Sequence, residues 1–154
     1  MSKTARVRWG WLKFMYIYTI IGAGGFGLGM LLFPGWIQSL FRFPAQDPVV
    51  FGITGSVYAG FGLISILGLG SPLKFAPVLL LQLCYKVLWL FGVIVPLLVS
   101  DQFPLYATTL LVIFVSYIIG DCIAIPFSHV FAKATDSSMN TGRINPSAVS
   151  ETTE

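Results

Sequence analysis

Two ionisable side chains, Lys86 and Asp121, each lie inside a long apolar stretch of the sequence. A charge in the hydrocarbon of a membrane costs at least a few kcal/mol, so such residues usually face the interior of a helix bundle and take a partner. An ammonium and a carboxylate brought together there can form an ion pair, hold a polar head group or relay a proton. The pair is therefore the first candidate for a functional site.

Helical spacing predicts which side chains lie beside this pair. Residues three or four positions apart share one helix face, which places Gln82 and Trp89 beside Lys86 and Tyr117 beside Asp121. Counted at 1.5 Å per residue from the ends of the apolar stretches, Lys86 lies about 16 Å and Asp121 about 9 Å into the membrane. A lysine side chain can extend several ångströms toward the interface, so one polar patch in the cytoplasmic half is expected.

Tyrosines of the other apolar stretches are further candidates for the wall of this patch, on depth alone: Tyr58, and either Tyr16 or Tyr18. Three interpretations stay open. The ion pair could fix helix register, or the patch could line a cavity that holds the head group of a quinone, a sterol or an acyl lipid. In the third interpretation Lys86 and Asp121 never meet and serve different contacts, including contacts with another subunit.

The elements that must position these residues are transmembrane helices. Hydrophobic residues make up 56% of the 154 residues and charged residues only 10%, and the mean hydropathy is +0.84. Four apolar stretches, about 14–33, 49–69, 75–99 and 105–127, each reach the roughly 20 residues that a helix needs to cross a bilayer. They do not alternate apolar and polar residues as barrel strands do. We therefore predict an all-α, four-helix transmembrane bundle.

The distribution of Lys and Arg predicts the orientation of this bundle. With four spans both termini lie on one side, and that side collects the basic residues Lys3, Arg6, Arg8, Lys13, Lys74, Lys133 and Arg143. The opposite loops hold only Arg42. Since Lys and Arg are retained in the cytoplasm, residues 1–13 are predicted to form a basic cytoplasmic N-terminus and 132–154 a disordered cytoplasmic tail. The net charge of +3 is explained by topology and lipid head groups, so no nucleic-acid partner is expected.

The segment between the first two spans, 34–44, carries Trp36, Ile37, Leu40 and Phe41 at helical spacing. This pattern is typical of a short helix in the outer interface, where Trp is common and Arg42 can reach head groups. A loop packed on the bundle is the alternative.

Small residues predict how the first two spans pack. Gly25 and Gly29 on the first, with Gly52, Ser56 and Gly60 on the second, form small-xxx-small ridges that let helix backbones approach closely. The ridges could pack within the chain or form the contact of a homo-oligomer or a larger membrane complex. A match to the dinucleotide pattern GxGxxG at 22–27 lies in the middle of a span without a preceding strand, so it is treated as accidental.

Metal and cofactor chemistry has little support in the sequence. Cys84 and Cys122 form no CxxC pair, and the chain has one histidine, His129. A structural zinc site needs about four clustered ligands, so no metal and no tightly bound cofactor is expected. The GxSxG, HExxH, Walker and deaminase motifs are absent from the sequence, so an enzyme is the less favoured class.

The length, the four spans, the glycine-rich start and the stretch GSVYAGFGL at 55–63 resemble the DoxX-like group of small four-helix bacterial membrane proteins. The resemblance implies a multi-pass protein of the bacterial inner membrane. Some members of that group are associated with quinone-linked oxidation of sulfur compounds. The group commonly has an acidic residue in its second helix, where this chain has Ser56 and Tyr58.

The sequence thus favours a small accessory or amphiphile-binding membrane protein with a polar site around Lys86 and Asp121. A membrane enzyme or carrier that uses the pair for proton or quinone-linked chemistry is one alternative. A structural subunit of a larger membrane complex is the other.

Overall fold

The computed structural model describes residues 7–127, and all of its helices belong to one compact unit, Arg8–Ile125. Within the described residues the fold is helical without strands. Four helical segments are long and apolar enough to cross a membrane: Trp9–Leu32, Pro48–Gly70, Pro72–Val99 and Leu105–Ala124. The predicted all-α class and the four spans are confirmed. The predicted tail at 132–154 lies outside the described residues.

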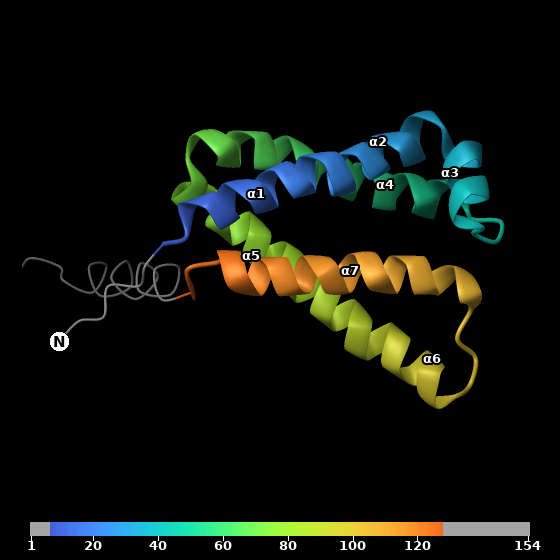
Figure 1. Cartoon of the computed structure of the whole chain (residues 1–154). Helices are drawn as coiled ribbons and strands as arrows, with labels where there is room; N and C mark the ends of the chain where they lie inside the picture. Colours follow the sequence, from blue (N-terminus) through green and yellow to red (C-terminus); the bar gives the residue numbers. More distant parts are fainter. Residues whose placement is uncertain (1–6, 128–154) are drawn as a thin grey trace, which may run out of the picture. The chain divides into compact units, whose positions relative to one another are not determined.

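The first segment runs as α1 (Trp9–Thr19), a π-helical turn η1 (Ile20–Gly24) and α2 (Gly25–Leu32). It begins at Trp9, inside the segment predicted as a basic N-terminus. A short helix, α3 (Pro34–Phe41), follows, and α4 (Pro48–Gly70) returns alongside α1 and α2 (Figure 1). The short helix predicted within 34–44 is therefore present, while its place in the outer interface stays a prediction. Arg42 ends α3 in the left-handed conformation.

Prolines and one aspartate fix where the helices begin. Proline lies in the first turn of α3, α4 and α5 (Pro72–Trp89), where its missing N–H costs nothing because the first turn has no intrahelical acceptor. At α4, Asp47 Oδ1 also accepts hydrogen bonds from the backbone N–H groups of Val49 and Val50, at 3.0 and 2.9 Å. Such an N-cap satisfies backbone donors that would otherwise lack partners.

Glycines let the first two long segments approach closely. A Cβ added to Gly24 would lie 3.0 Å from the Cα of Gly62, and one added to Gly27 would lie 2.5 Å from the carbonyl oxygen of Gly55. These are backbone contacts, which cannot move aside as a flexible side chain can. Backbone packing of this kind is how small residues join membrane helices.

The prediction that the first two spans pack through small residues is correct, but the glycines that it named are not the ones in contact. A Cβ on Gly25, Gly52 or Gly60 would meet nothing within 4 Å, and one on Gly29 would meet Ile37 of α3. Ser56 is exposed and its hydroxyl bonds to the Gly52 carbonyl of its own helix. In its glycine-rich part the first span has small residues on most sides. Their spacing alone therefore does not show which side packs on α4.

The π-helical turn η1 explains which face of α2 packs on α4. The buried side of α1 carries Leu12, Tyr16 and Thr19. A π turn holds more residues than an α turn, so this side continues after η1 through Gly24 and Gly27, both buried.

The third span is divided into α5 (Pro72–Trp89), a second π-helical turn η2 (Leu90–Ile94) and α6 (Val95–Val99). Pro96 lies in α6, just after η2, and proline disturbs the helical hydrogen bonds of the preceding turn. The π turn therefore lies where the proline weakens the regular α-helical pattern. In Figure 1 the segment crosses α7 (Leu105–Ala124) and diverges from it toward α6, which has no buried residue.

The fourth span ends earlier than predicted, because α7 stops at Ala124 instead of 127. Ile125 has extended dihedral angles (φ −71°, ψ 122°), as expected for a residue that precedes proline. Pro126 therefore terminates the helix.

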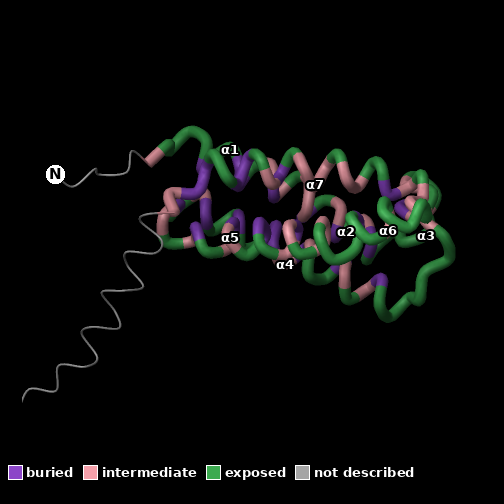
Figure 2. Tube along the Cα trace, turned by 90° about the horizontal axis from the view of Figure 1, so that it is seen from below, coloured by how far each residue is buried: buried purple, intermediate pink, exposed green. Residues whose placement is uncertain are grey.

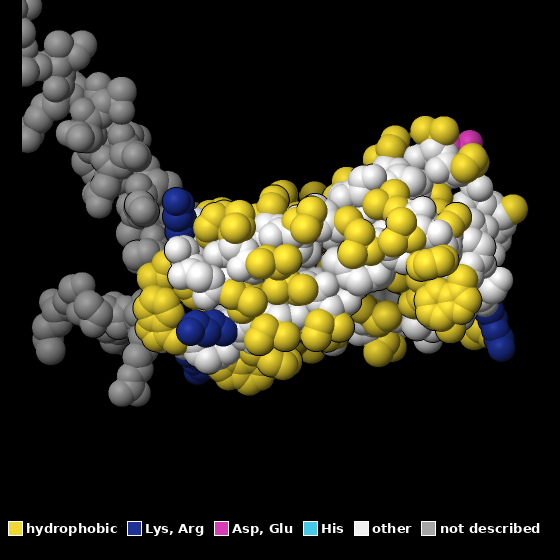
Figure 3. Space-filling model, turned by 90° about the horizontal axis from the view of Figure 1, so that it is seen from above, with side chains coloured by type: hydrophobic (Ala, Val, Ile, Leu, Met, Phe, Trp, Pro, Cys, Tyr) yellow, Lys and Arg dark blue, Asp and Glu magenta, His cyan; other side chains and the backbone are white. Residues whose placement is uncertain are grey.

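Apolar side chains cover the outer faces of the long helices. Figure 2 shows burial concentrated where the helices face one another, and Figure 3 shows hydrophobic side chains over the body with Lys and Arg toward its ends. Exposed residues include Ile21, Ile53, Leu88, Phe91 and Val112. In water such a surface would aggregate, whereas lipid tails solvate it. The four helices thus define a multi-pass membrane bundle.

One buried hydrogen bond ties the first span to the third. The Tyr16 hydroxyl donates to the Pro72 carbonyl oxygen at 2.7 Å. We expect Tyr16→Phe to lower the free energy of unfolding by about 1 kcal/mol, the net value of one such bond. Equilibrium unfolding in mixed micelles with increasing dodecyl sulfate measures the change. Tyr106→Phe is the control, because the Tyr106 ring packs on Phe43 and its hydroxyl makes no hydrogen bond within residues 7–127. Equal losses in both variants would contradict the expectation.

Candidate functional site

Lys86 lies near the middle of the third span and is 1% exposed. Its ammonium Nζ donates to Gln82 Oε1 at 2.9 Å, and the Gln82 amide nitrogen donates to Thr19 Oγ1 at 3.4 Å. Gln82 and Thr19 are also completely buried. A short polar chain therefore connects the first and third spans through the core, and Gln82 holds the lysine in place from one helical turn away.

Three aromatic rings surround the same ammonium. Nζ lies 4.2 Å from the ring centroid of Tyr117, 4.8 Å from that of Tyr85 and 5.9 Å from that of Phe114. A cation over a ring face is stabilised by the ring quadrupole, by about 2 kcal/mol where water is excluded. These rings favour the charged form of a lysine that has left water.

Tyr117 is held firmly by the first span. Its hydroxyl donates to the backbone carbonyl of Tyr18 at 2.9 Å, and the two tyrosine rings stack with centroids 4.3 Å apart. The space for this hydroxyl exists because residue 22 is glycine, since a Cβ there would overlap the phenol oxygen. Gly22 therefore sets the position of one wall of the lysine site.

Asp121 is completely buried, and neither of its carboxylate oxygens has a hydrogen-bond partner among the described residues. The hypothesised direct ion pair is therefore not formed, because Lys86 bonds to Gln82 instead. The two charges are still close enough to interact electrostatically. Tyr16, Tyr85 and Tyr117 also lie within electrostatic range of this carboxylate. Buried carboxylates without partners are rare, and this one marks the site as chemically unusual.

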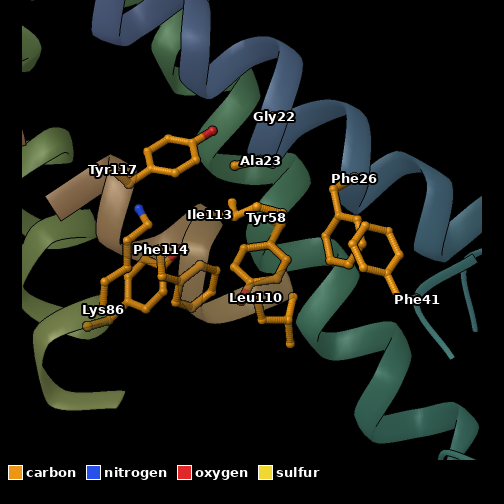
Figure 4. A pocket seen from close by; sticks show the side chains of 11 residues that line it. Gly22, Ala23, Phe26, Phe41, Tyr58, Lys86, Leu110, Ile113, Phe114 and Tyr117 are labelled. Atoms are coloured by element: carbon orange, nitrogen blue, oxygen red, sulfur yellow. The ribbon is translucent and has the colours of Figure 1, made fainter. Parts of the chain in front are cut away.

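A cavity of about 220 Å³ lies beside the ammonium (Figure 4). In Figure 4 the Lys86 side chain extends toward Tyr117 beside Phe114, Phe26 and Phe41 lie at the opposite end, and Tyr58 lies between the two ends. Every long helical segment contributes. The lining residues are Gly22, Ala23, Phe26, Phe41, Tyr58, Tyr85, Lys86, Leu110, Ile113, Phe114 and Tyr117. Lys86 is the one charged side chain in this lining.

The predicted site residues take different places around the cavity. Lys86, Tyr117 and Tyr58 line it, and Gln82 supports Lys86 from behind. Trp89 packs edge-on against Phe114, with ring centroids 4.8 Å apart, and does not itself line the cavity. Asp121 also lies outside the lining.

Several contributing residues were not predicted, among them Tyr85, Phe114, Thr19 and Phe26. Tyr85 adjoins Lys86 in sequence, and Phe114 precedes Tyr117 by one helical turn, so aromatic residues near the predicted pair were the available signal. Thr19 and Phe26 belong to the first span, and nothing in their spacing relates them to Lys86. Their positions follow from the packing of α1 and α2 on the bundle.

Within residues 7–127 no cluster of three or more His, Cys, Asp or Glu side chains could hold a metal ion. Cys84 and Cys122 are both exposed on the outer surface, apart from the cavity. The site is therefore an apolar cavity with aromatic walls and the N–H donors of the Lys86 ammonium at one end.

Comparison of the chain with protein-family models, curated proteins and solved structures gives no match. The resemblance to the DoxX-like group therefore stays a prediction.

Proposed function

We propose that this protein binds a membrane amphiphile, with the apolar part in the aromatic cavity and the polar head group at Lys86. One observation supports the proposal above all: a buried ammonium lines a cavity whose other walls are apolar or aromatic. Lysine has three N–H donors, and within the described chain Lys86 gives one of them to Gln82. An occupant with an acceptor atom would satisfy the others.

The size of the cavity limits the occupant. A cavity of about 150 Å³ accepts benzene, so one of about 220 Å³ accommodates roughly nine carbon-sized atoms by the same measure. A single ring or a short length of acyl chain fits this space. The four fused rings of a sterol exceed it, so a quinone ring or an acyl chain is favoured over a sterol.

The proposed orientation places both termini in the cytoplasm. Among the described residues, Arg8, Lys13 and Lys74 belong to the end of the bundle where the first span begins and the third span begins. Arg42 belongs to the opposite end, together with Asp47 and Asp101. This asymmetry agrees with retention of basic residues in the cytoplasm.

Photolabelling tests the binding site. A C8 carboxylic acid and the matching C8 alcohol, each with a diazirine on the chain, are added to the full chain in phosphatidylcholine nanodiscs. We expect labels on cavity residues such as Phe114 and Tyr58, and at least tenfold less cavity labelling in Lys86→Met. Lys74→Met, which removes an exposed lysine of the same helix, should label normally.

Peptide mapping of the cross-links measures the result. Labels spread evenly over the lipid-facing surface, or cavity labels unchanged in Lys86→Met, would contradict the proposal. Native mass spectrometry of the extracted protein adds the natural occupant, because a co-purifying amphiphile changes the mass. A partner subunit in the same spectrum would instead favour the structural-subunit alternative.

A further inference from the structure

We infer that the amphiphile carries an anionic head group, and that its binding is coupled to the uptake of one proton by Asp121. This inference rests on the proposed function, because it concerns the same cavity and the same lysine. It is carried by three observations on residues 7–127: Lys86 gives only one of its donors to another residue there, the carboxylate of Asp121 has no hydrogen-bond partner there, and the two groups do not bond to each other.

The chemistry of Lys86 selects the head group. Its ammonium faces the cavity, and its one hydrogen bond within the described residues goes to the neutral amide of Gln82. Asp121 does not approach closely enough to form a hydrogen bond with it. An anion such as a carboxylate, phosphate or sulfonate can therefore accept hydrogen bonds from this ammonium. Hydrogen bonds between charged groups are about twice as strong as those between neutral groups, so an anionic head group is favoured.

The charge balance then requires a proton. With Lys86 positive and Asp121 negative, the empty site carries no net charge. A bound anion adds a negative charge in a region without water, where charges are expensive. One proton from the aqueous phase, bound as O–H on an oxygen of Asp121, restores neutrality. No other bond forms or breaks.

Asp121 is the group in this set that can accept the proton. The titratable side chains that interact with it are Tyr16 from α1, Tyr85 and Lys86 from α5, and Tyr117 from its own helix. A tyrosine and an ammonium already carry their protons at neutral pH, so they have no further site for one.

Asp121 lies nearer the end of its helix than the residues that surround the Lys86 ammonium. It lies three residues before the end of α7 at Ala124, which corresponds to about 4.5 Å along the helix. The Lys86 ammonium lies beside the ring of Tyr117, which is one helical turn farther from that end of α7. The carboxylate therefore occupies the position nearer the helix ends and the ammonium the position beside the ligand.

Proton uptake can be measured directly. The full chain in phosphatidylcholine nanodiscs is titrated in weakly buffered solution with octane-1-sulfonate, which stays ionised at all relevant pH values, and separately with octan-1-ol. We expect about one proton taken up per bound sulfonate and none per bound alcohol. By linkage, sulfonate affinity should fall about tenfold per unit rise in pH, while alcohol affinity stays constant.

Two variants assign the proton to Asp121. Asp121→Asn should bind octane-1-sulfonate without proton uptake and without pH dependence. Asp101→Asn, which changes an exposed acid of the 100–104 loop, should behave as wild type. Sulfonate binding without proton uptake in the wild type would overturn the inference, as would undiminished uptake in Asp121→Asn. Binding of the alcohol alone would overturn the anionic head group and leave the proposed function standing, whereas failure of both probes would overturn both.

Discussion

Gly27→Leu is expected to unfold or strongly destabilise the bundle, with a loss of at least about 3 kcal/mol in the free energy of unfolding. A Cβ at this position would lie 2.5 Å from the carbonyl oxygen of Gly55 and 2.9 Å from the carbonyl carbon of Tyr58. Both are backbone atoms of α4, so the two helices must separate. Overpacking by single methylene groups already costs about 1–3 kcal/mol, and a leucine side chain adds several.

Gly25→Leu is the matched control, since it makes the same chemical change two residues away. A Cβ on Gly25 would meet nothing within 4 Å, so this variant should stay within about 0.5 kcal/mol of the wild type, as surface substitutions do. Unfolding in mixed micelles, followed by circular dichroism, compares the two. Similar stabilities for Gly27→Leu and Gly25→Leu would show that α2 and α4 do not pack through Gly27.

The second large effect is expected from a double-mutant cycle on Lys86 and Asp121. Lys86→Met leaves the buried Asp121 without a nearby cation, and Asp121→Leu leaves the buried ammonium without a nearby anion. Each single change should destabilise the bundle, whereas the double variant should be more stable than either single one, because it removes both buried charges. We expect a coupling energy of about 1–2 kcal/mol. This is less than the 3–5 kcal/mol typical of breaking a hydrogen-bonded buried pair.

The same micelle unfolding assay measures this cycle. Lys86→Met combined with Asp101→Asn provides the control, since these residues lie on different elements far apart in the fold and should act additively. Additive effects for Lys86 and Asp121 as well would mean that the two charges do not interact. A double variant that folds and still binds the C8 probes would give the pair a purely structural role.

The helices could be predicted from the sequence because each is a long apolar stretch bounded by prolines or polar residues. The errors lie where tertiary packing decides. Trp9 to Lys13 join the first helix although the sequence there is only partly apolar. The fourth span was predicted to reach 127, but the extended conformation of Ile125, which precedes Pro126, ends the helix at Ala124. The packing face of the first helix depends on η1, and a π turn has no clear sequence pattern.

The site could be predicted in part. Charges are rare inside membrane spans, which singled out Lys86 and Asp121, and helical spacing added Gln82 and Tyr117. The distance between the two charged groups depends on helix rotation, which one sequence does not define. Three aromatic residues of the cavity wall, Tyr85, Phe114 and Phe26, were not predicted for a different reason. The chain has 13 Phe and 6 Tyr, so an aromatic side chain on a span does not by itself mark a site.

The unequal lengths of the third and fourth spans make this protein sensitive to bilayer thickness. The 28 residues of Pro72–Val99 form a helix about 42 Å long, while the 20 residues of Leu105–Ala124 form one about 30 Å long. A hydrocarbon core of about 30 Å matches the shorter helix, so the longer one must tilt. Thicker bilayers let it stand more upright, and thinner ones incline it further away from α7. Since Tyr85, Lys86 and Phe114 lie on these two helices and line the cavity, we expect the width of the cavity to change with lipid chain length.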